Sequence, residues 1–203
     1  MNYQGKHYAF TNVGVIPKPL QRPYPPMRVA ATTAETFPMM GRQGFPLFIG
    51  LRGSDLEMNV SHLEKYREAW REAGHPGNGD VYVRLPIYVA ETEEAAYEDP
   101  RESTLNNYRS RGEGYASRAE GAGTAEERAE FARRIAAAGY DDLLRTRLAY
   151  GTPDAVIARL QQLQSDLGLS GVIMEPNVGG GIPRDKVYNS VRLFAERVAP
   201  ALH

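Results

Sequence analysis

Apolar residues recur at helical spacing in three segments of the chain, residues 56–73, 153–167 and 184–198. Positions three and four apart lie on one side of a helix, so each segment predicts an amphipathic helix with one buried stripe. Thr152 and Pro153 mark the start of the second helix, as its cap and its first residue. The predicted stripes are Leu56, Val60, Leu63, Tyr66, Trp70 and Ala73; then Val156, Leu160, Leu163 and Leu167; then Val187, Val191, Phe194 and Val198.

Four shorter apolar runs predict buried strands at residues 27–32, 47–51, 81–90 and 171–175. A strand followed by a helix thus occurs four times along the chain. Alternation with helical crossovers predicts parallel strands with the helices packed outside them. The pattern therefore indicates an α/β fold.

Two capping patterns mark further helices. Thr92 precedes an acidic first turn, where the helix dipole favours negative charge. Thr124 and Glu127 form a capping box that opens a helix over residues 125–138, and Gly139 is expected to end that helix.

Three other segments carry weaker signals. Residues 34–43 are long enough for a helix of two to three turns, whereas residues 98–123 are rich in glycine and charge and predict a mobile loop or an imperfect helix. Residues 1–26 are irregular, and proline at five of ten consecutive positions predicts an extended surface segment. Of two interpretations, a ligand for a proline-recognition module and a rigid connection into the first strand, the second is favoured.

Composition narrows the class of protein. The 203 residues are 24% charged and 42% hydrophobic with a net charge of −1, which fits a globular domain and lacks the basic excess of a nucleic-acid-binding protein. Cysteine is absent, so disulfides, thiol nucleophiles and cysteine metal sites are excluded. No apolar run approaches the roughly 20 residues of a membrane span, and residues 1–10 lack the apolar region of a signal peptide. The expected location is therefore the cytoplasm, without membrane association.

The usual catalytic motifs are missing from the sequence. The four histidines, His7, His62, His75 and His203, have no partner at metal-ligand spacing, so no metal site is expected. A nucleophile elbow, a P-loop and a G-x-G-x-x-G fingerprint are also absent.

Two strand–helix junctions are candidates for binding phosphate. At the first, Thr33 and Thr36 follow an apolar run, so their hydroxyls and the amides at the helix start could meet one anion. Helix capping by one threonine explains this pattern equally well. At the second, Gly179, Gly180 and Gly181 permit close backbone approach, although a tight turn without a ligand is the favoured interpretation.

Four phrases together resemble a known family. In chain order they are "YAFTNVGVIPKPLQRPYPPMRVAATTAETF", "PIYVAETEEAA", "GTPDAVIARL" and "GVIMEPNVGGGIPRDKVYNSVRLFAERVAPAL". At this spacing they resemble the C-terminal portion of bacterial-luciferase-like flavin-dependent monooxygenases, least well across residues 98–147. The resemblance implies the C-terminal half of a (β/α)₈ TIM-type barrel, a single partial domain over residues 1–203 that supplies strands five to eight with their helices.

The resemblance also implies a cofactor and its site. The family binds FMN, supplied in reduced form, or in one branch the deazaflavin F420, at the carboxyl ends of the strands. The positions that match the family's FMN-phosphate site are Thr33 and Thr36 with the backbone of Ala34 and Glu35, while Thr32 matches a position that is acidic in some relatives. Catalytic residues stay unassigned, because the groups that usually contact the flavin ring belong to the first half of the barrel.

The implied activity is that of a flavin-dependent monooxygenase acting on a small organic substrate with oxygen, active only together with the other half-barrel. Alternatives are a non-catalytic flavin-binding or self-associating module and a fragment of an F420-dependent oxidoreductase. A half-barrel exposes inward-facing apolar residues, expected here at Val29, Phe48, Ile87 and Ile173. Another copy, in a homo-oligomer, or the missing half-barrel is expected to cover them.

Overall fold

A parallel sheet forms the centre of the molecule. The computed structural model describes residues 1–51, 56–116 and 125–202. The sheet contains β3 (Val29–Ala30), β4 (Leu47–Gly50), β5 (Val81–Val89), β6 (Ala149–Gly151) and β7 (Gly171–Glu175). β3 pairs with β4, β4 with β5, and β5 with both β6 and β7, and every pair is parallel. The four predicted strands and their parallel order are confirmed; β6, with three residues, is an addition that is too short for periodicity to reveal.

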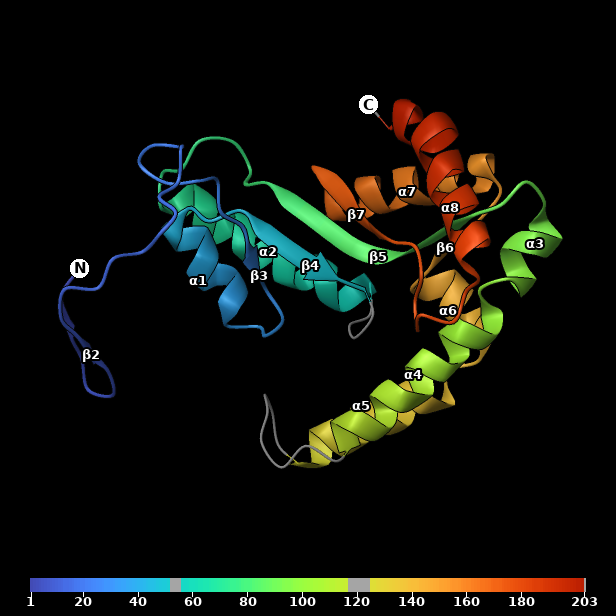
Figure 1. Cartoon of the computed structure of the whole chain (residues 1–203), viewed down its shortest axis with the longest axis horizontal. Helices are drawn as coiled ribbons and strands as arrows, with labels where there is room; N and C mark the ends of the chain where they lie inside the picture. The colour runs from blue at the N-terminus through green and yellow to red at the C-terminus, as the bar shows by residue number, and fades with distance from the viewer. Residues whose placement is uncertain (52–55, 117–124, 203) are drawn as a thin grey trace.

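Helices connect these strands and follow the last one (Figure 1). They are α1 (Thr36–Gln43), α2 (Leu56–Glu72), α3 (Glu93–Glu98), α4 (Arg101–Ala116), α5 (Ala125–Ala137), α6 (Tyr140–Thr146), α7 (Pro153–Leu167) and α8 (Arg184–Leu193), the last continued by a π-helical turn η1 (Phe194–Val198) and a 3₁₀ turn η2 (Ala199–Ala201). The segment 98–123, predicted as a loop or an imperfect helix, thus begins with the regular helix α4.

One face of the sheet is buried beneath helices. Alternate residues of β5, from Val81 to Val89, are at most 1% exposed and pack in one cluster with the stripes of α2 and α7. All four residues predicted for the α7 stripe are buried, and so are Leu63, Tyr66 and Trp70 of α2. Ala73 lies beyond the end of α2 and is exposed, so the predicted stripe was one position too long.

Over β3, β4 and the first half of β5, none of the described helices covers the opposite face of the sheet in this way, and we call this part the open face. Toward the carboxyl end of β5 the same face is covered, because Tyr88 packs against Ala96 and Ile182. Strand alternation places on the open face Ala30, Phe48, Gly50, Tyr82, Arg84, Ile173 and Glu175. The expectation of inward-facing Val29 and Ile87 was wrong: both pack in the helix-covered cluster, because they have the opposite parity along their strands. Phe48 and Ile173 do lie on the open face, where both are half-buried.

The C-terminal helix turns most of the predicted stripe inward, since Val198 is buried and Val187 and Phe194 pack against core clusters, but Val191 is not part of it. Val198 and Leu193 are buried, whereas Val191 is 40% exposed and Val187 and Phe194 are half-buried. Val191 precedes the π-helical turn over 194–198, and the predicted member at the end of that turn, Val198, is buried. Leu193, which the predicted stripe omitted, is buried on α8.

The capping predictions had mixed outcomes. Thr92 caps α3, because its Oγ accepts from the amide of Ala95 at 3.2 Å. Thr152 makes no such bond; its hydroxyl donates to Glu93 at 3.3 Å. Gly139 does not end a helix in left-handed conformation but precedes α6 in extended conformation, at φ −69°. The predicted Thr124 capping box lies outside the described residues.

Helices α4, α5 and α6 form a unit beside the sheet. Tyr108, Ile135, Tyr140, Leu143 and Leu148 make its apolar cluster, which is separate from the cluster under the sheet. α4 and α5 run side by side, and Figure 1 shows them extending downward from the sheet.

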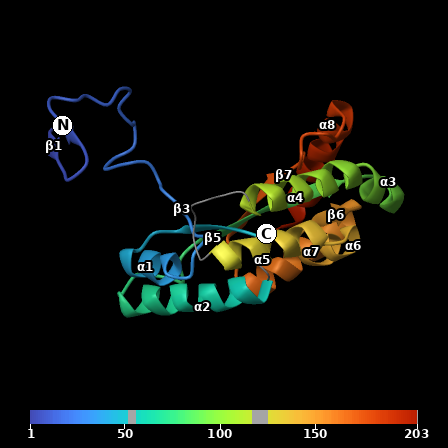
Figure 2. The same ribbon diagram turned by 90° about the horizontal axis from the view of Figure 1, so that it is seen from below.

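Residues 1–27 form an extended segment, which we call the arm. Its strands β1 (Tyr3–Gln4) and β2 (Ala9–Phe10) make a small antiparallel hairpin. The arm leaves the body of the molecule at β3, as Figure 2 shows most clearly. This agrees with the prediction of an extended surface segment.

Candidate functional site

The junction between β3 and α1 brings two of the predicted site residues together. Thr33 follows β3 by three residues and Thr36 is the first residue of α1. Their hydroxyl oxygens lie 2.9 Å apart, and the amide of Thr36 donates to the carbonyl of Thr33 at 3.0 Å. Both side chains are half-buried, so the pair is held in place yet accessible from solvent.

The other predicted residues surround this pair without joining it. Thr32, Ala34 and Glu35 are exposed, and the Glu35 side chain makes no capping bond to α1. No carbonyl in the described part of the backbone accepts from the amides of Ala34 or Glu35. Free amides at a helix start, beside two hydroxyls, suit an anion with several acceptor oxygens.

The hydroxyl pair sets how many protons are available to such an anion. Either Thr33 or Thr36 can be the donor between them, and each hydroxyl carries one hydrogen. While the pair stays together, one hydrogen is used internally and the other is available. A ligand that accepts from both hydroxyls must replace this internal bond.

His62 of α2 adds no positive charge near α1 at neutral pH. Its ring packs against Phe37 with centroids 4.7 Å apart. Burial and the nearby Lys65 lower the pKa of His62, and Glu35 opposes them only in part. The site therefore relies on hydroxyls and amides.

The glycine loop, the second phosphate candidate, is occupied by contacts within the chain. The amide of Gly181 donates to Ser103 Oγ at 2.9 Å, and that hydroxyl donates to the carbonyl of Val178 at 2.6 Å. The backbone carbonyl of Asn177 accepts from the amide of Gly180, and its side-chain Oδ1 accepts from the amide of Ile182.

Gly179 explains why this loop needs glycine. Its φ is +85°, and a Cβ there would lie 2.3 Å from the backbone oxygen of Ser103. The glycines thus permit close packing on α4; the amide of Gly181 is used in that packing and the amide of Gly180 bonds within the loop. The favoured interpretation, a tight turn without a ligand, agrees with this geometry.

An exposed arginine, Arg84, lies in the middle of the open face. Gly50 pairs with Arg84, and Arg84 pairs with Ile173, so these three residues lie side by side on three strands. The Arg84 side chain is 61% exposed and forms an ion pair with Glu175, whose side chain is 11% exposed. Sequence reasoning missed this pair, although one arginine in the apolar run "VYVRLPIYV" was a usable signal.

A polar cluster closes the carboxyl end of β5. Tyr88 is 2% exposed and donates to Asp99 at 3.0 Å, and Asp99 also receives a bond from Lys186 of α8. Burial, reinforced by the bond to Asp99, raises the pKa of Tyr88, so its phenol stays protonated at neutral pH. The same carboxylate raises the pKa of Lys186. This arrangement fixes α3, α4 and α8 around the strand end.

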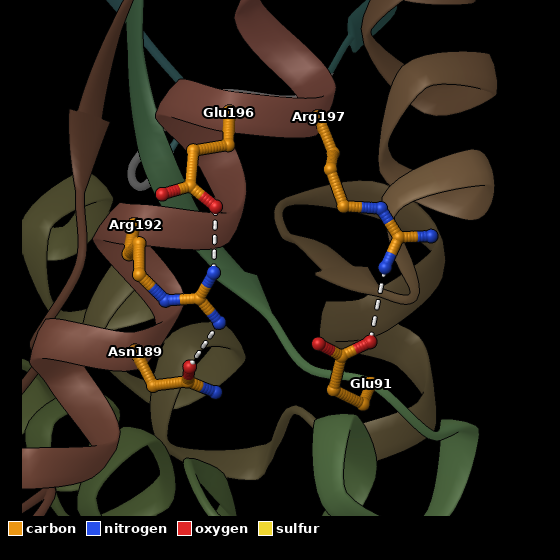
Figure 3. A network of polar contacts seen from close by, with 5 residues as sticks. All are labelled: Glu91, Asn189, Arg192, Glu196 and Arg197. Carbon is orange, nitrogen blue, oxygen red and sulfur yellow. Dashed lines mark hydrogen bonds and ion pairs between the residues drawn. The ribbon is translucent and has the colours of Figure 1, made fainter.

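An exposed ion pair links the C-terminal helix to the same strand end (Figure 3). Arg197 donates to Glu91, two residues after β5, at 3.0 Å. Arg192 meanwhile contacts Glu196 and Asn189 on its own helix, at 2.6 and 2.8 Å. Exposed ion pairs of this kind contribute about 0–1 kcal/mol each to the free energy of unfolding, so they add little to the stability of α8.

Metal and membrane sites find no support in the part of the chain that the structure describes. Among residues 1–51, 56–116 and 125–202, no three metal-ligating side chains gather in one place. Of the four histidines, His62 packs on Phe37 and His75 bonds to the carbonyl of Arg42 at 2.9 Å. None of the described helices has the length and apolar character to cross a bilayer.

Comparison with known proteins decides the family. The model of the luciferase-like monooxygenase family matches residues 1–170, most of the chain. The chain belongs to the luciferase-like monooxygenase family. Comparison with curated protein sequences finds no match.

Solved structures agree with this membership at the level of the fold. Monooxygenase RslO1 from Streptomyces bottropensis matches all of this chain at 24% identity with a TM-score of 0.69, over 56% of its own length. The oxygenating constituent of 3,6-diketocamphane monooxygenase from Pseudomonas putida, solved with FMN, matches all of it at 17% identity and 0.70, over 58% of its length. The F420-dependent tetrahydromethanopterin reductase from Methanopyrus kandleri also matches all of this chain, at 18% identity with a TM-score of 0.66, over 58% of its own length.

The chain therefore has the α/β fold of part of a luciferase-like barrel. It spans 56–58% of the length of these three solved structures. Members of this fold class described above bind FMN or F420, so a flavin-type cofactor fits the family.

Proposed function

We propose that this chain supplies the phosphate-binding part of a flavin-dependent monooxygenase, with FMN as cofactor and with oxygen and a small organic molecule as substrates. The observation that carries the proposal is the hydroxyl pair of Thr33 and Thr36, 2.9 Å apart where a parallel strand meets a helix. A phosphate dianion is the kind of ligand that two hydroxyls, free amides and a helix start bind together.

The residues present fit that group. Thr33 and Thr36 would donate to the phosphate, and the amides of Ala34 and Glu35 would complete the cradle. Bound FMN supplies the redox chemistry, which explains why the sequence lacks a catalytic triad or metal site. The protein's part is to bind, to orient and to exclude water.

Exclusion of water requires more than the described residues. Arg84, in the middle of the open face, is 61% exposed in its side chain. A reaction centre on this face would therefore stay in contact with solvent unless another polypeptide surface covers it. We infer that turnover depends on such a cover, and the cytoplasm is the compartment we propose for the complex.

F420 is a second candidate cofactor, supported by one observation. Two neighbours of similar fold are named as F420-dependent enzymes, the reductase from Methanopyrus kandleri and a secondary alcohol dehydrogenase with TM-score 0.61. A non-catalytic flavin-binding module is the third candidate, and the exposed face supports it. Titration with FMN and with F420, followed by their distinct visible spectra, separates the two cofactors, and an assay of oxygen consumption separates an enzyme from a non-catalytic module.

The decisive experiment is flavin titration of the chain and of Thr33→Val/Thr36→Val, monitored by quenching of FMN fluorescence. A hydrogen bond to a charged group contributes about 1.5–3 kcal/mol. Loss of both should weaken binding by roughly two to four powers of ten if the contributions add. Thr146→Val, an exposed threonine of α6, is the matched control and should leave the affinity unchanged.

One result would count against the proposal, and riboflavin tests whether the double variant is intact. Equal affinity of the double variant and the control would reduce the threonines to a helix start without a ligand. Riboflavin, which lacks the phosphate, should bind both proteins alike; a large loss of riboflavin binding in the double variant would indicate a damaged fold.

A further inference from the structure

The arm concentrates the exposed apolar surface of the described chain. Ten of the fourteen large hydrophobic side chains that are exposed lie in residues 1–27. Ile16 is 87% and Leu20 93% exposed, and four aromatic residues, Tyr3, Tyr8, Phe10 and Tyr24, are 42–71% exposed. Scattered exposed apolar residues are normal, but a concentration of this kind marks an interaction surface.

The arm is ordered enough to act as a ligand. The amino group of Met1 donates to the carbonyl of Val13 at 2.7 Å, and the amide of Asn12 donates to Asn2 at 2.7 Å. The ring of Phe10 lies 6.0 Å from that of Tyr3 and 6.4 Å from that of Tyr8. The proline-rich part loses little conformational entropy on binding, because proline already restricts the backbone.

The charge of the arm is opposite to that of the rest of the chain. The full sequence has 24 basic and 25 acidic residues. The arm holds three of the basic residues, Lys6, Lys18 and Arg22, and none of the acidic ones, so the remainder carries 21 basic against 25 acidic residues. The net charges of the arm and of the remainder therefore favour contact between an arm and a body of this chain. On the open face itself the charges are mixed, with Arg28 and Arg84 beside Glu175.

The open face offers the complementary surface. Phe48 and Tyr82 pair across β4 and β5 and are half-buried, with their ring centroids 6.0 Å apart. Arg28 already lies over the Tyr82 ring, 4.1 Å from its centroid. Arg84 lies exposed beside them, and while its guanidinium stays paired with Glu175 its outer face can stack on an aromatic ring of an incoming segment.

We propose that the arm of one copy lies across the open face of a second copy, and that the second arm returns the contact in a two-fold dimer. The proposal concerns association and does not depend on flavin binding. Each copy then has both of its unpartnered surfaces, the arm and the open face, buried by the same partner.

Length and area fit this arrangement. The face is about four strands wide, or roughly 15–20 Å at about 4.8 Å per strand, and seven extended residues span up to about 23 Å. The four arm aromatics, at the exposures given above, present roughly 300–550 Å². Two such contacts with the matching area of the face come to about 1,200–2,200 Å², the size of a stable interface.

The test uses sedimentation equilibrium of the whole chain with three variants. The arm variant is Ile16→Asp/Leu20→Asp, the face variant is Phe48→Lys, and the control is Tyr188→Asp, which changes an exposed aromatic on α8. We expect the unchanged chain and the control to form dimers. Each of the other two alone should dimerise at least about 30-fold more weakly.

Mixing the variants distinguishes arm exchange from other dimers. The arm variant keeps an intact face and the face variant keeps an intact arm, so an equimolar mixture should form mixed dimers through one restored contact. A face variant that still dimerises alone would indicate arm-to-arm pairing, and an arm variant that does so would indicate face-to-face pairing. Either result, or a monomeric unchanged chain, would overturn the proposal.

Cysteine pairing provides a readout that survives if Phe48→Lys fails to fold. The chain has no cysteine, so introduced thiols are the only ones present. Leu20→Cys in one copy and Phe48→Cys in a copy of different tag length should form a mixed disulfide on oxidation. With both changes in one chain, a crosslink within a monomer would show that the arm covers its own face and would refute the exchange.

Discussion

Replacing Ser103 by alanine should separate the structural role of the glycine loop from the binding of phosphate. The hydroxyl of Ser103 donates to the carbonyl of Val178 and accepts from the amide of Gly181, so Ser103→Ala leaves two backbone groups without this partner. Val178 is 1% exposed, so water cannot readily replace the bond to its carbonyl. An unsatisfied buried group costs about 1–3 kcal/mol, and the more exposed Gly181 amide adds less.

Urea unfolding measures this cost. With a slope of about 2 kcal/mol/M, a loss of about 1–3 kcal/mol lowers the midpoint by roughly 0.5–1.5 M without changing the slope. Ser110→Ala, the same substitution at an exposed position of α4, is the control and should stay within about 0.5 kcal/mol. Flavin affinity, measured below the unfolding range, should be the same in both variants.

Two outcomes would refute this reasoning. If Ser103→Ala were as stable as Ser110→Ala, the contact between α4 and the loop would contribute nothing. If Ser103→Ala bound flavin clearly more weakly while Thr33→Val/Thr36→Val did not, the phosphate would belong at the glycine loop.

Three further predictions concern stability. Leu160 lies in the buried stripe of α7 and is 2% exposed, so Leu160→Ala should lower the free energy of unfolding by about 2–5 kcal/mol, measured in urea. Its exposed neighbour is the control: Gln161→Ala should change this free energy by less than about 0.5 kcal/mol. Because the pKa of His62 is lowered in the folded chain, the unfolded chain takes up its proton first as pH falls below about 6.5. The parent should therefore lose stability relative to His62→Gln between pH 7.5 and 5, and a constant difference over that range would exclude this linkage. Glu91→Gln, which breaks the exposed pair with Arg197, should cost less than about 1 kcal/mol, and a larger loss in thermal unfolding would mean that the pair is better shielded than its exposure indicates.

The helices α2 and α7 could be predicted from sequence because their burial follows from one repeating stripe. α4 could not, because its sequence has almost no apolar stripe and contains Gly112 and Gly114. It is nevertheless helical, and Tyr108 on its inner side packs with Tyr140 and Leu143 of α6. Tertiary contacts of this kind outweigh local propensity and leave no periodic signal in the chain.

The candidate site was predicted only where its members are neighbours in sequence. Thr33 and Thr36 are three residues apart, so a helix start was enough to bring them together. Arg84 and Glu175 are 91 positions apart in the sequence, on β5 and β7, and only the register between these two strands places them on one face. The errors at Val29 and Ile87 have the same origin, since parity along a strand requires knowledge of which residues pair.

The position of β5 has a consequence for how the chain is made. β5 pairs with β7, and the amide of Val81 bonds to a side chain 89 residues further on. At about 5–20 residues per second, a ribosome needs roughly 4–18 s to make that interval. During this time the edge of β5 that pairs with β7 stays unpaired, while α3 to α7 are synthesised. Until β7 is made, that unpaired edge can pair with another nascent chain or with a chaperone.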